Sequence, residues 1–128
     1  MKIRIGVGAA GAVSTPEQLG ELMTALDEPG FGSIWLSEVL TGPVPDPAVG
    51  LAWGAAFNAK VKLGTTMLLP GRNVLRLAKQ LATLDVLSRG RVLVTLVPRL
   101  TYPPEREAIG VEPKQRGAVV DEALPLLR

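Results

Sequence analysis

Apolar and polar residues follow two different periodicities along this chain, and the change between them recurs about every 30 residues. Short apolar runs rich in β-branched residues start near Ile3, Ser33, Lys62 and Arg91, at intervals of 30, 29 and 29 residues. Each run is followed by a segment whose apolar residues recur with the spacing of a helix. Repeated strand–helix units predict a parallel sheet with right-handed crossovers.

The interval between the units indicates which parallel sheet to expect. A TIM barrel uses roughly 250 residues for eight units, or about 31 per unit. We therefore predict an α/β fold made of the first four of eight TIM-barrel-like units. This half-barrel has parallel strands in the order 1-2-3-4 with helices on one outer side, and residues 1–128 form a single domain.

Cap residues mark the starts of the first two predicted helices and the end of the third. Thr15-Pro16-Glu17-Gln18 is a capping box with proline at the first helical position. A second helix is expected from Asp46-Pro47 to about residue 59, and a third over 74–88, before Gly90.

The C-terminal part predicts a loop and one more helix. The stretch around Pro103-Pro104 reads as a polar loop after the fourth strand, which is expected over 92–97. The last helix is expected over 113–128, with a kink at Pro125.

Composition excludes several functional classes. The chain has 47% hydrophobic and 20% charged residues, enough to form a core. Its 14 basic and 12 acidic residues are interspersed, so no nucleic-acid partner is expected. The chain has no cysteine or histidine, which removes thiolate metal sites and the commonest general base. No apolar run is long enough to span a membrane and no signal peptide is evident, so we expect a cytoplasmic protein.

One glycine motif suggests a different fold. Gly6, Gly8 and Gly11 match the dinucleotide-binding fingerprint, with Glu38 as the ribose carboxylate. That fingerprint needs its last glycine inside the helix, so that the pyrophosphate meets the helix N-terminus. Here the helix starts at Thr15, four residues after Gly11. We therefore prefer close packing inside a barrel, and keep a Rossmann-type domain as a further alternative.

Four stretches carry a resemblance to a known family. Residues 77–91, LAKQLATLDVLSRGR, closely resemble the third helix and fourth-strand entry of the bacterial-luciferase-like monooxygenases. Residues 30–38, 61–65 and 109–122 resemble the second strand, the third strand and the fourth helix of the same family. The resemblance spans the chain in the right order and implies a TIM-like barrel that uses FMN or the deazaflavin coenzyme F-420.

The resemblance also implies where the cofactor binds. The family holds its flavin at the C-terminal ends of the strands. Carried onto this sequence, the wall positions are Ala9-Ala10, Ser37, Glu38, Thr65, Thr66, Met67 and Thr95, with Leu96-Val97 following.

Within that set, Glu38 is either a cofactor contact or base, or a solvated loop carboxylate. Whichever of Thr65 and Thr66 faces the helices is expected to serve the strand instead of the cofactor. No catalytic residue and no metal site are assigned.

The sequence departs from the family pattern at two positions. Val39 stands where many members have histidine, and Val97-Pro98-Arg99-Leu100 stands where a glycine-rich turn is common. The family's phosphate-binding segments lie in the second half of its barrel. Arg99 is a possible phosphate contact, although a surface arginine is the preferred interpretation.

These observations leave two main functional hypotheses. The first is a luciferase-like oxidoreductase or monooxygenase that uses a flavin or deazaflavin on an apolar small-molecule substrate. The alternative is a non-catalytic truncated paralogue or interaction module. The first and fourth strands are open edges, so we also expect a homo-oligomer or a second chain that completes the barrel.

Overall fold

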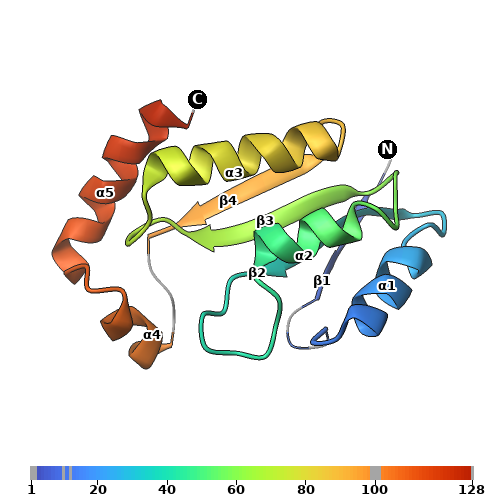
Figure 1. The fold of residues 1–128 in the computed structure, drawn as a ribbon, viewed down its shortest axis with the longest axis horizontal. Helices are drawn as coiled ribbons and strands as arrows, with labels where there is room; N and C mark the ends of the chain where they lie inside the picture. The colour runs from blue at the N-terminus through green and yellow to red at the C-terminus, as the bar shows by residue number, and fades with distance from the viewer. Residues whose placement is uncertain (1–2, 10, 12, 99–101, 128) are drawn as a thin grey trace.

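A parallel sheet of four strands forms the centre of the molecule (Figure 1). The computed structural model describes residues 3–9, 11, 13–98 and 102–127. The strands are β1 (Ile5–Gly8), β2 (Phe31–Ser37), β3 (Lys62–Leu68) and β4 (Val92–Val97). They lie in the order β1-β2-β3-β4 and every neighbouring pair is parallel. This order confirms the half-barrel and excludes the Rossmann alternative, whose sheet reverses direction at a switch point.

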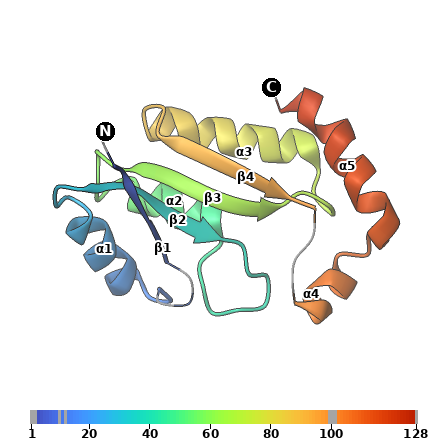
Figure 2. The ribbon, with the colours of Figure 1, turned by 180° about the vertical axis from the view of Figure 1, so that it is seen from behind.

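In the part of the chain that the structure describes, three helices cover one face of the sheet and no helix lies on the other. They are α1 (Pro16–Ala25), α2 (Pro47–Gly54) and α3 (Val74–Leu87). Figures 1 and 2 show the two sides: the helices lie in front of the strands in one view and behind them in the other. None of the helices in the described ranges is long and apolar enough to cross a membrane.

The predicted cap residues start α1 and α2, and a cap that was not predicted, Asn73, starts α3. Thr15 Oγ1 accepts a hydrogen bond from Gln18 N at 3.3 Å, and Gln18 Oε1 accepts one from Thr15 N at 3.2 Å, which completes the capping box. Asp46 Oδ1 accepts from the first free N–H groups of α2. Asn73 does the same for α3 through Arg76 N, at 3.1 Å.

The second helix is shorter than predicted. It ends at Gly54 instead of near residue 59, because Asn58 organises the turn that follows. The buried Asn58 side chain donates to Met23 O at 2.9 Å and accepts from Val61 N at 3.0 Å. Arg91 reinforces this turn by donating to the carbonyl oxygen of Asn58 at 2.8 Å. Burial, and secondarily the charge of Arg89, lower the pKa of the Arg91 guanidinium.

The C-terminal segment differs most from the prediction. The expected loop contains a helix, α4 (Pro103–Ala108), because proline is well tolerated in the first turn. The expected long helix is three pieces: η1 (Pro113–Gln115), α5 (Arg116–Ala123) and η2 (Leu124–Leu126). The prediction of one kinked helix over 113–128 was therefore wrong. Pro125 lacks an N–H for the α-helical pattern, and the chain continues as a 3₁₀ turn.

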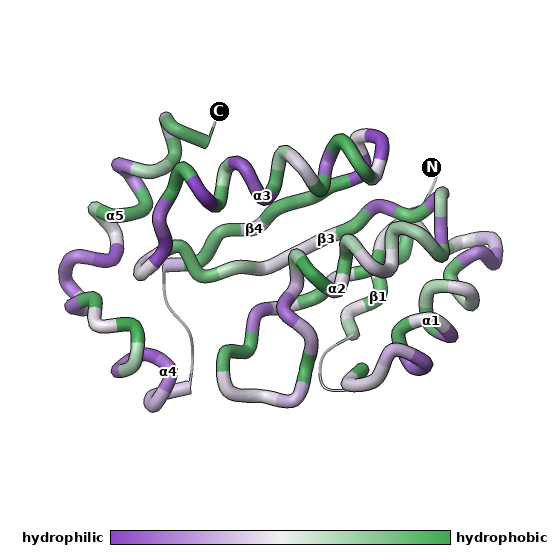
Figure 3. The backbone as a smooth tube through the Cα atoms, in the orientation of Figure 1, coloured by the Kyte–Doolittle hydropathy of each residue, from purple (hydrophilic) through white to green (hydrophobic). Residues whose placement is uncertain are grey.

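The core lies between the sheet and the helices. Figure 3 shows apolar residues recurring along α3, with hydrophilic residues between them. One buried cluster joins β2 and β3 to α1 and α2, and includes Met23, Ile34, Leu51 and Leu63. A second joins the end of β3 to α2, α3 and α5, and consists of Ala48, Met67, Leu69, Leu77 and Ala123.

Candidate functional site

Three hydroxyl side chains form a row across the face of the sheet that carries no helix. Ser37 is the register partner of Thr66, and Thr66 is the register partner of Thr95. Ser37 is the last residue of β2, so the row lies at the C-terminal ends of the strands. With strands about 4.8 Å apart, the row spans about 10 Å. Ser37 and Thr95 are exposed and Thr66 is half-buried, so a ligand can reach them.

Towards the N-terminal side of this row the sheet has a smooth floor. Gly8, Trp35, Gly64 and Leu93 are successive register partners from β1 to β4. The Trp35 indole fills the space above Gly64, and its Nε1 donates to Ser33 Oγ at 3.0 Å. Beside it, a Cβ added at Gly8 would meet nothing within 4 Å. The open face therefore places apolar surface beside a row of hydroxyl groups.

Glu38 follows the row directly but is engaged within the protein. Its Oε2 accepts from Leu68 N at 2.7 Å, and its Oε1 forms an ion pair with Arg72. Arg72 Nε also donates to the carbonyl oxygen of Leu68, at 2.9 Å. The carboxylate is buried, so the solvated-carboxylate interpretation was wrong. With both oxygens engaged, Glu38 holds the end of β2 to the turn after β3.

Arg72 was not predicted from the sequence as a partner of Glu38. The available signal was topological: β2 and β3 are neighbours, so an acid at the end of one and a base after the other come together. A sequential parallel sheet makes that pairing predictable once the strand order is assumed.

Two of the predicted site residues face the helices. Thr65 and Met67 are fully buried in the helix-covered face, because successive strand residues point to opposite faces. The structure therefore does not place these side chains beside the hydroxyl row, and Thr66 is the threonine of β3 on the open face.

Ala9 belongs to the buried core and also lines a small cleft beside Ser37. It is buried in the first core cluster and its N–H donates to Trp35 O at 3.0 Å. Together with Ser37 it lines a small cleft of about 70 Å³ between the segments that follow β1 and β2. Ala10 and Arg99, also considered from the sequence, lie outside the described residues.

A second buried carboxylate joins two loops at the C-terminal end of the sheet. Glu105 of α4 accepts hydrogen bonds from the N–H and the hydroxyl of Thr41, both at 2.8 Å. This contact connects the segment after β2 to the helix after β4. It was missed because the region of α4 was predicted to be a loop.

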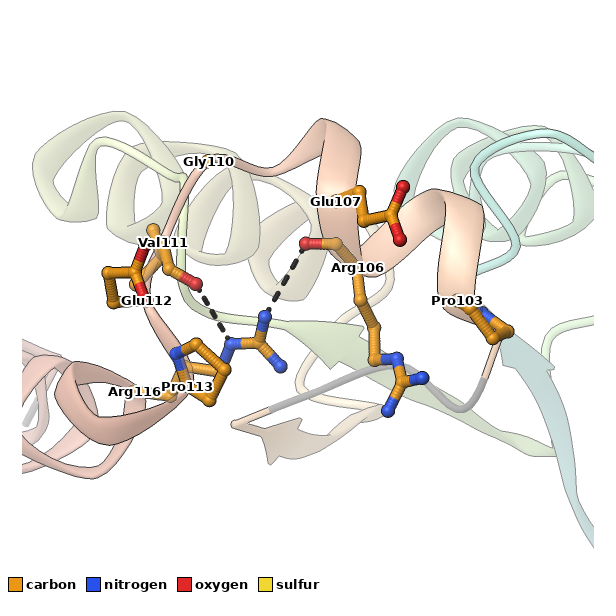
Figure 4. Close-up of a pocket in the computed structure, with 8 residues that line it drawn as sticks. All are labelled: Pro103, Arg106, Glu107, Gly110, Val111, Glu112, Pro113 and Arg116. Atoms are coloured by element: carbon orange, nitrogen blue, oxygen red, sulfur yellow. Dashed lines mark hydrogen bonds between the residues drawn. The ribbon is translucent and has the colours of Figure 1, made fainter.

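A polar hollow of about 600 Å³ lies between α4 and α5 (Figure 4). The buried Arg116 guanidinium donates to the carbonyl oxygens of Val111 at 3.1 Å and Arg106 at 3.4 Å. Glu107 and Glu112 also line the hollow, so its two arginines are matched by two carboxylates. We interpret Arg116 as a tie between the two helices. The described residues hold no cluster of three or more potential metal ligands.

Comparison with known proteins identifies the family to which this sequence is similar. The sequence profile of the family described as luciferase-like monooxygenase matches residues 1–128. The F420-dependent glucose-6-phosphate dehydrogenase of Kineococcus radiotolerans is 28% identical over 137 residues, which cover 98% of this chain and 40% of that protein. The chain thus spans about two fifths of this relative.

Solved structures with the same fold are also found. Monooxygenase RslO1 from Streptomyces bottropensis superposes with a TM-score of 0.83 at 31% identity, over 99% of this chain and 42% of its own. The oxygenating constituent of 3,6-diketocamphane monooxygenase from Pseudomonas putida, solved in complex with FMN, has a TM-score of 0.85 at 20% identity, over 99% and 39%. The strand order, the helix-covered face and the profile match agree, and the chain belongs to the luciferase-like monooxygenase family.

Proposed function

We propose that the open face of the sheet binds the ring of a flavin or of the deazaflavin coenzyme F420, as part of an oxidoreductase or monooxygenase. The observation that carries the proposal is the row of Ser37, Thr66 and Thr95 at the C-terminal ends of the strands, where barrel active sites lie. The FMN complex of one structural relative and the F420 dependence of a sequence relative support this choice of cofactor.

In this proposal the residues of the chain bind the cofactor and orient it. A bound flavin or deazaflavin supplies the hydride or electron transfer itself. The three hydroxyls offer donors and acceptors to the polar edge of the ring, and Trp35 with Gly8 forms the floor beneath it. The Glu38–Arg72 pair and the Glu105–Thr41 contact hold the surrounding loops. The absence of histidine is compatible with this division of labour, because the protein need not supply an acid–base pair.

We expect the isolated chain to bind the cofactor weakly. It supplies one wall of the site, whereas phosphate anchoring in barrels is often built after strands seven and eight. The substrate expected for the whole site is an apolar small molecule.

Titration with FMN and, separately, with coenzyme F420 tests the proposal through cofactor fluorescence. Dissociation constants well above the micromolar range are expected. Thr66→Val and Thr95→Val should weaken binding further, because each removes a hydroxyl from the row. Thr65→Val is the matched control, since it makes the same change on the opposite face and should leave binding unchanged.

Two results would contradict the proposal. One is folded protein that binds neither cofactor, which would favour the non-catalytic paralogue. The other is equal weakening by Thr65→Val and Thr66→Val, which would place the cofactor away from the open face.

A further inference from the structure

Strand β2 ends before its neighbour β3, and the last residue of β3 is left without a partner strand on that side. Ser37 and Thr66 are the last register pair of the two strands, and β3 continues to Leu68. The N–H of Glu38 still donates to Thr66 O at 2.9 Å. In a parallel ladder the next bonds would join the C=O and N–H of Leu68 to backbone groups of residues 40 and 38. Because β2 has ended, Leu68 needs other partners for both groups.

The Glu38–Arg72 pair supplies both partners. Glu38 Oε2 accepts from Leu68 N at 2.7 Å, and Arg72 Nε donates to Leu68 O at 2.9 Å. The ion pair between the two side chains closes a ring of contacts around Leu68. Two side chains thus take the place of the strand that has left the sheet, and they fasten the end of β2 to the end of β3.

A buried ion pair adds little stability compared with apolar residues of similar volume. The Glu38 side chain is 4% exposed, and the cost of removing its charge from water offsets much of the attraction to Arg72. Charge-assisted hydrogen bonds do impose a defined geometry, because each one restrains both a distance and a direction. The neighbour restrained most closely is Ser37, which precedes Glu38 and is the first hydroxyl of the row.

We infer that the Glu38–Arg72 pair positions the hydroxyl row for the cofactor. Without touching the cofactor, the pair fixes Ser37 relative to Thr66 and so determines how tightly the row binds the ring. The inference rests on the proposed function, because it assigns an effect on cofactor affinity. Thr95 should keep its place without the pair, since β4 is joined to β3 by six register pairs of its own.

NMR titration with FMN and, separately, with coenzyme F420 tests the inference, because it measures weak dissociation constants. Glu38→Ala removes the bridge to Leu68 and the ion pair together. At metal sites, loss of an outer partner of a binding residue weakens affinity by about 10–100-fold, and we expect about tenfold here. Glu38→Gln keeps an oxygen that can accept from Leu68 N–H, so it should weaken binding less. This milder variant decides the question if Glu38→Ala does not fold.

A variant with lost stability at the other end of the strands is the control. Asn58→Ala removes buried hydrogen bonds there and should leave the affinity unchanged. Folded Glu38 variants that bind as tightly as the wild-type protein would overturn the inference. Weakening of the same size by Asn58→Ala would also overturn it, because general destabilisation would then explain the effect.

A double-mutant cycle separates positioning from direct contact. Ser37→Ala should weaken binding in the wild-type background, but by less than about twofold in a folded Glu38 variant, because the hydroxyl is already displaced. Thr95→Val should keep its full effect in both backgrounds. Additive effects of the Ser37 and Glu38 substitutions would mean that the carboxylate acts on the cofactor by another route, and would contradict the inference.

Amide hydrogen exchange tests the placement without any cofactor. In Glu38→Ala, or in Glu38→Gln if the first does not fold, the N–H of residue 38 should exchange up to about tenfold faster, because the end of β2 opens more easily. The N–H of Leu63, which donates to Arg91 O at the other end of β3, is the internal control and should not change. Unchanged exchange at residue 38 would overturn the inference. Wild-type protein that binds neither cofactor would overturn the proposed function and this inference together, whereas wild-type binding that the Glu38 variants leave intact would overturn this inference alone.

Discussion

The indole of Trp35 occupies the volume that a side chain at position 64 would need. The two residues are direct register partners on β2 and β3, and a Cβ added to Gly64 would lie 2.2 Å from Trp35 Cδ2. Non-bonded carbon atoms do not approach that closely, so position 64 requires glycine. The pairing of Trp35 with Gly64 therefore shapes the floor of the open face.

Gly64→Ala should therefore lower the free energy of unfolding by about 1–3 kcal/mol, because the indole must move or the strands must separate. Urea unfolding followed by circular dichroism measures the change. Gly117→Ala in α5 is the matched control, since its Cβ would meet nothing within 4 Å. In a helix this change should be neutral or stabilising by up to about 1 kcal/mol. Equal effects of the two substitutions would show that the Trp35 contact does not constrain position 64.

Thr65→Val should raise the free energy of unfolding by about 1 kcal/mol, because Val removes a buried polar group without changing the shape of the side chain. The Thr65 hydroxyl is fully buried and, among the described residues, has no hydrogen-bond partner. Thr66→Val, on the open face, should change stability by less than about 0.5 kcal/mol. Paired denaturant melts of the two variants make the comparison. Destabilisation by Thr65→Val would mean that its hydroxyl has a partner after all.

Much of the fold follows from sequence periodicity. The four strands, their sequential order and the caps at Thr15 and Asp46 were predicted, because each depends on residues close in the sequence or on a repeated unit. The end of α2 was not predicted, since it depends on Asn58 bonding to Met23 of α1 and to Val61, the residue before β3.

The candidate site was predictable only in part, for the same reason. The sequence identified Ser37, Thr66 and Thr95, which share a face of the sheet in the structure. It did not decide which of two adjacent threonines faces the helices, because both faces of a parallel strand accept threonine. The partners of Glu38 and Glu105 come from other units, 34 and 64 residues away. The first pairing follows only once the strand order is assumed, and the second required coordinates. The cofactor contacts remain predictions.

The Glu38–Arg72 pair should hold the C-terminal edge of the sheet together. Glu38→Gln leaves Arg72, whose side chain is only 25% exposed, without its carboxylate, and should cost about 1–3 kcal/mol of stability. A double-mutant cycle with Arg72→Gln, measured by urea unfolding, isolates the interaction. The double variant should lose less than the two single variants together. Strict additivity would mean that the two side chains contribute independently.

Substitution of Asn58 tests whether one end of the sheet stabilises the fold while the other end binds the cofactor. Its side chain donates to Met23 O and Asp27 Oδ1 and accepts from two backbone N–H groups, which joins α1 to the start of β3. Asn58→Ala leaves several of these buried groups unpaired and should cost about 3 kcal/mol. Asn73→Ala, a matched change that removes one exposed cap bond, should cost about 1 kcal/mol.

Asn58→Ala should leave cofactor affinity unchanged in the protein that remains folded. Asn58 lies at the N-terminal end of the strands, and in barrels that end serves stability whereas ligands bind at the opposite end. Both variants, Asn58→Ala and Thr66→Val, are titrated with FMN and with coenzyme F420 at low denaturant concentration, and their unfolding free energies are measured separately. Asn58→Ala should change the unfolding free energy alone, and Thr66→Val the dissociation constant alone. A folded Asn58→Ala variant with weakened binding would show that the two ends of the half-barrel are coupled.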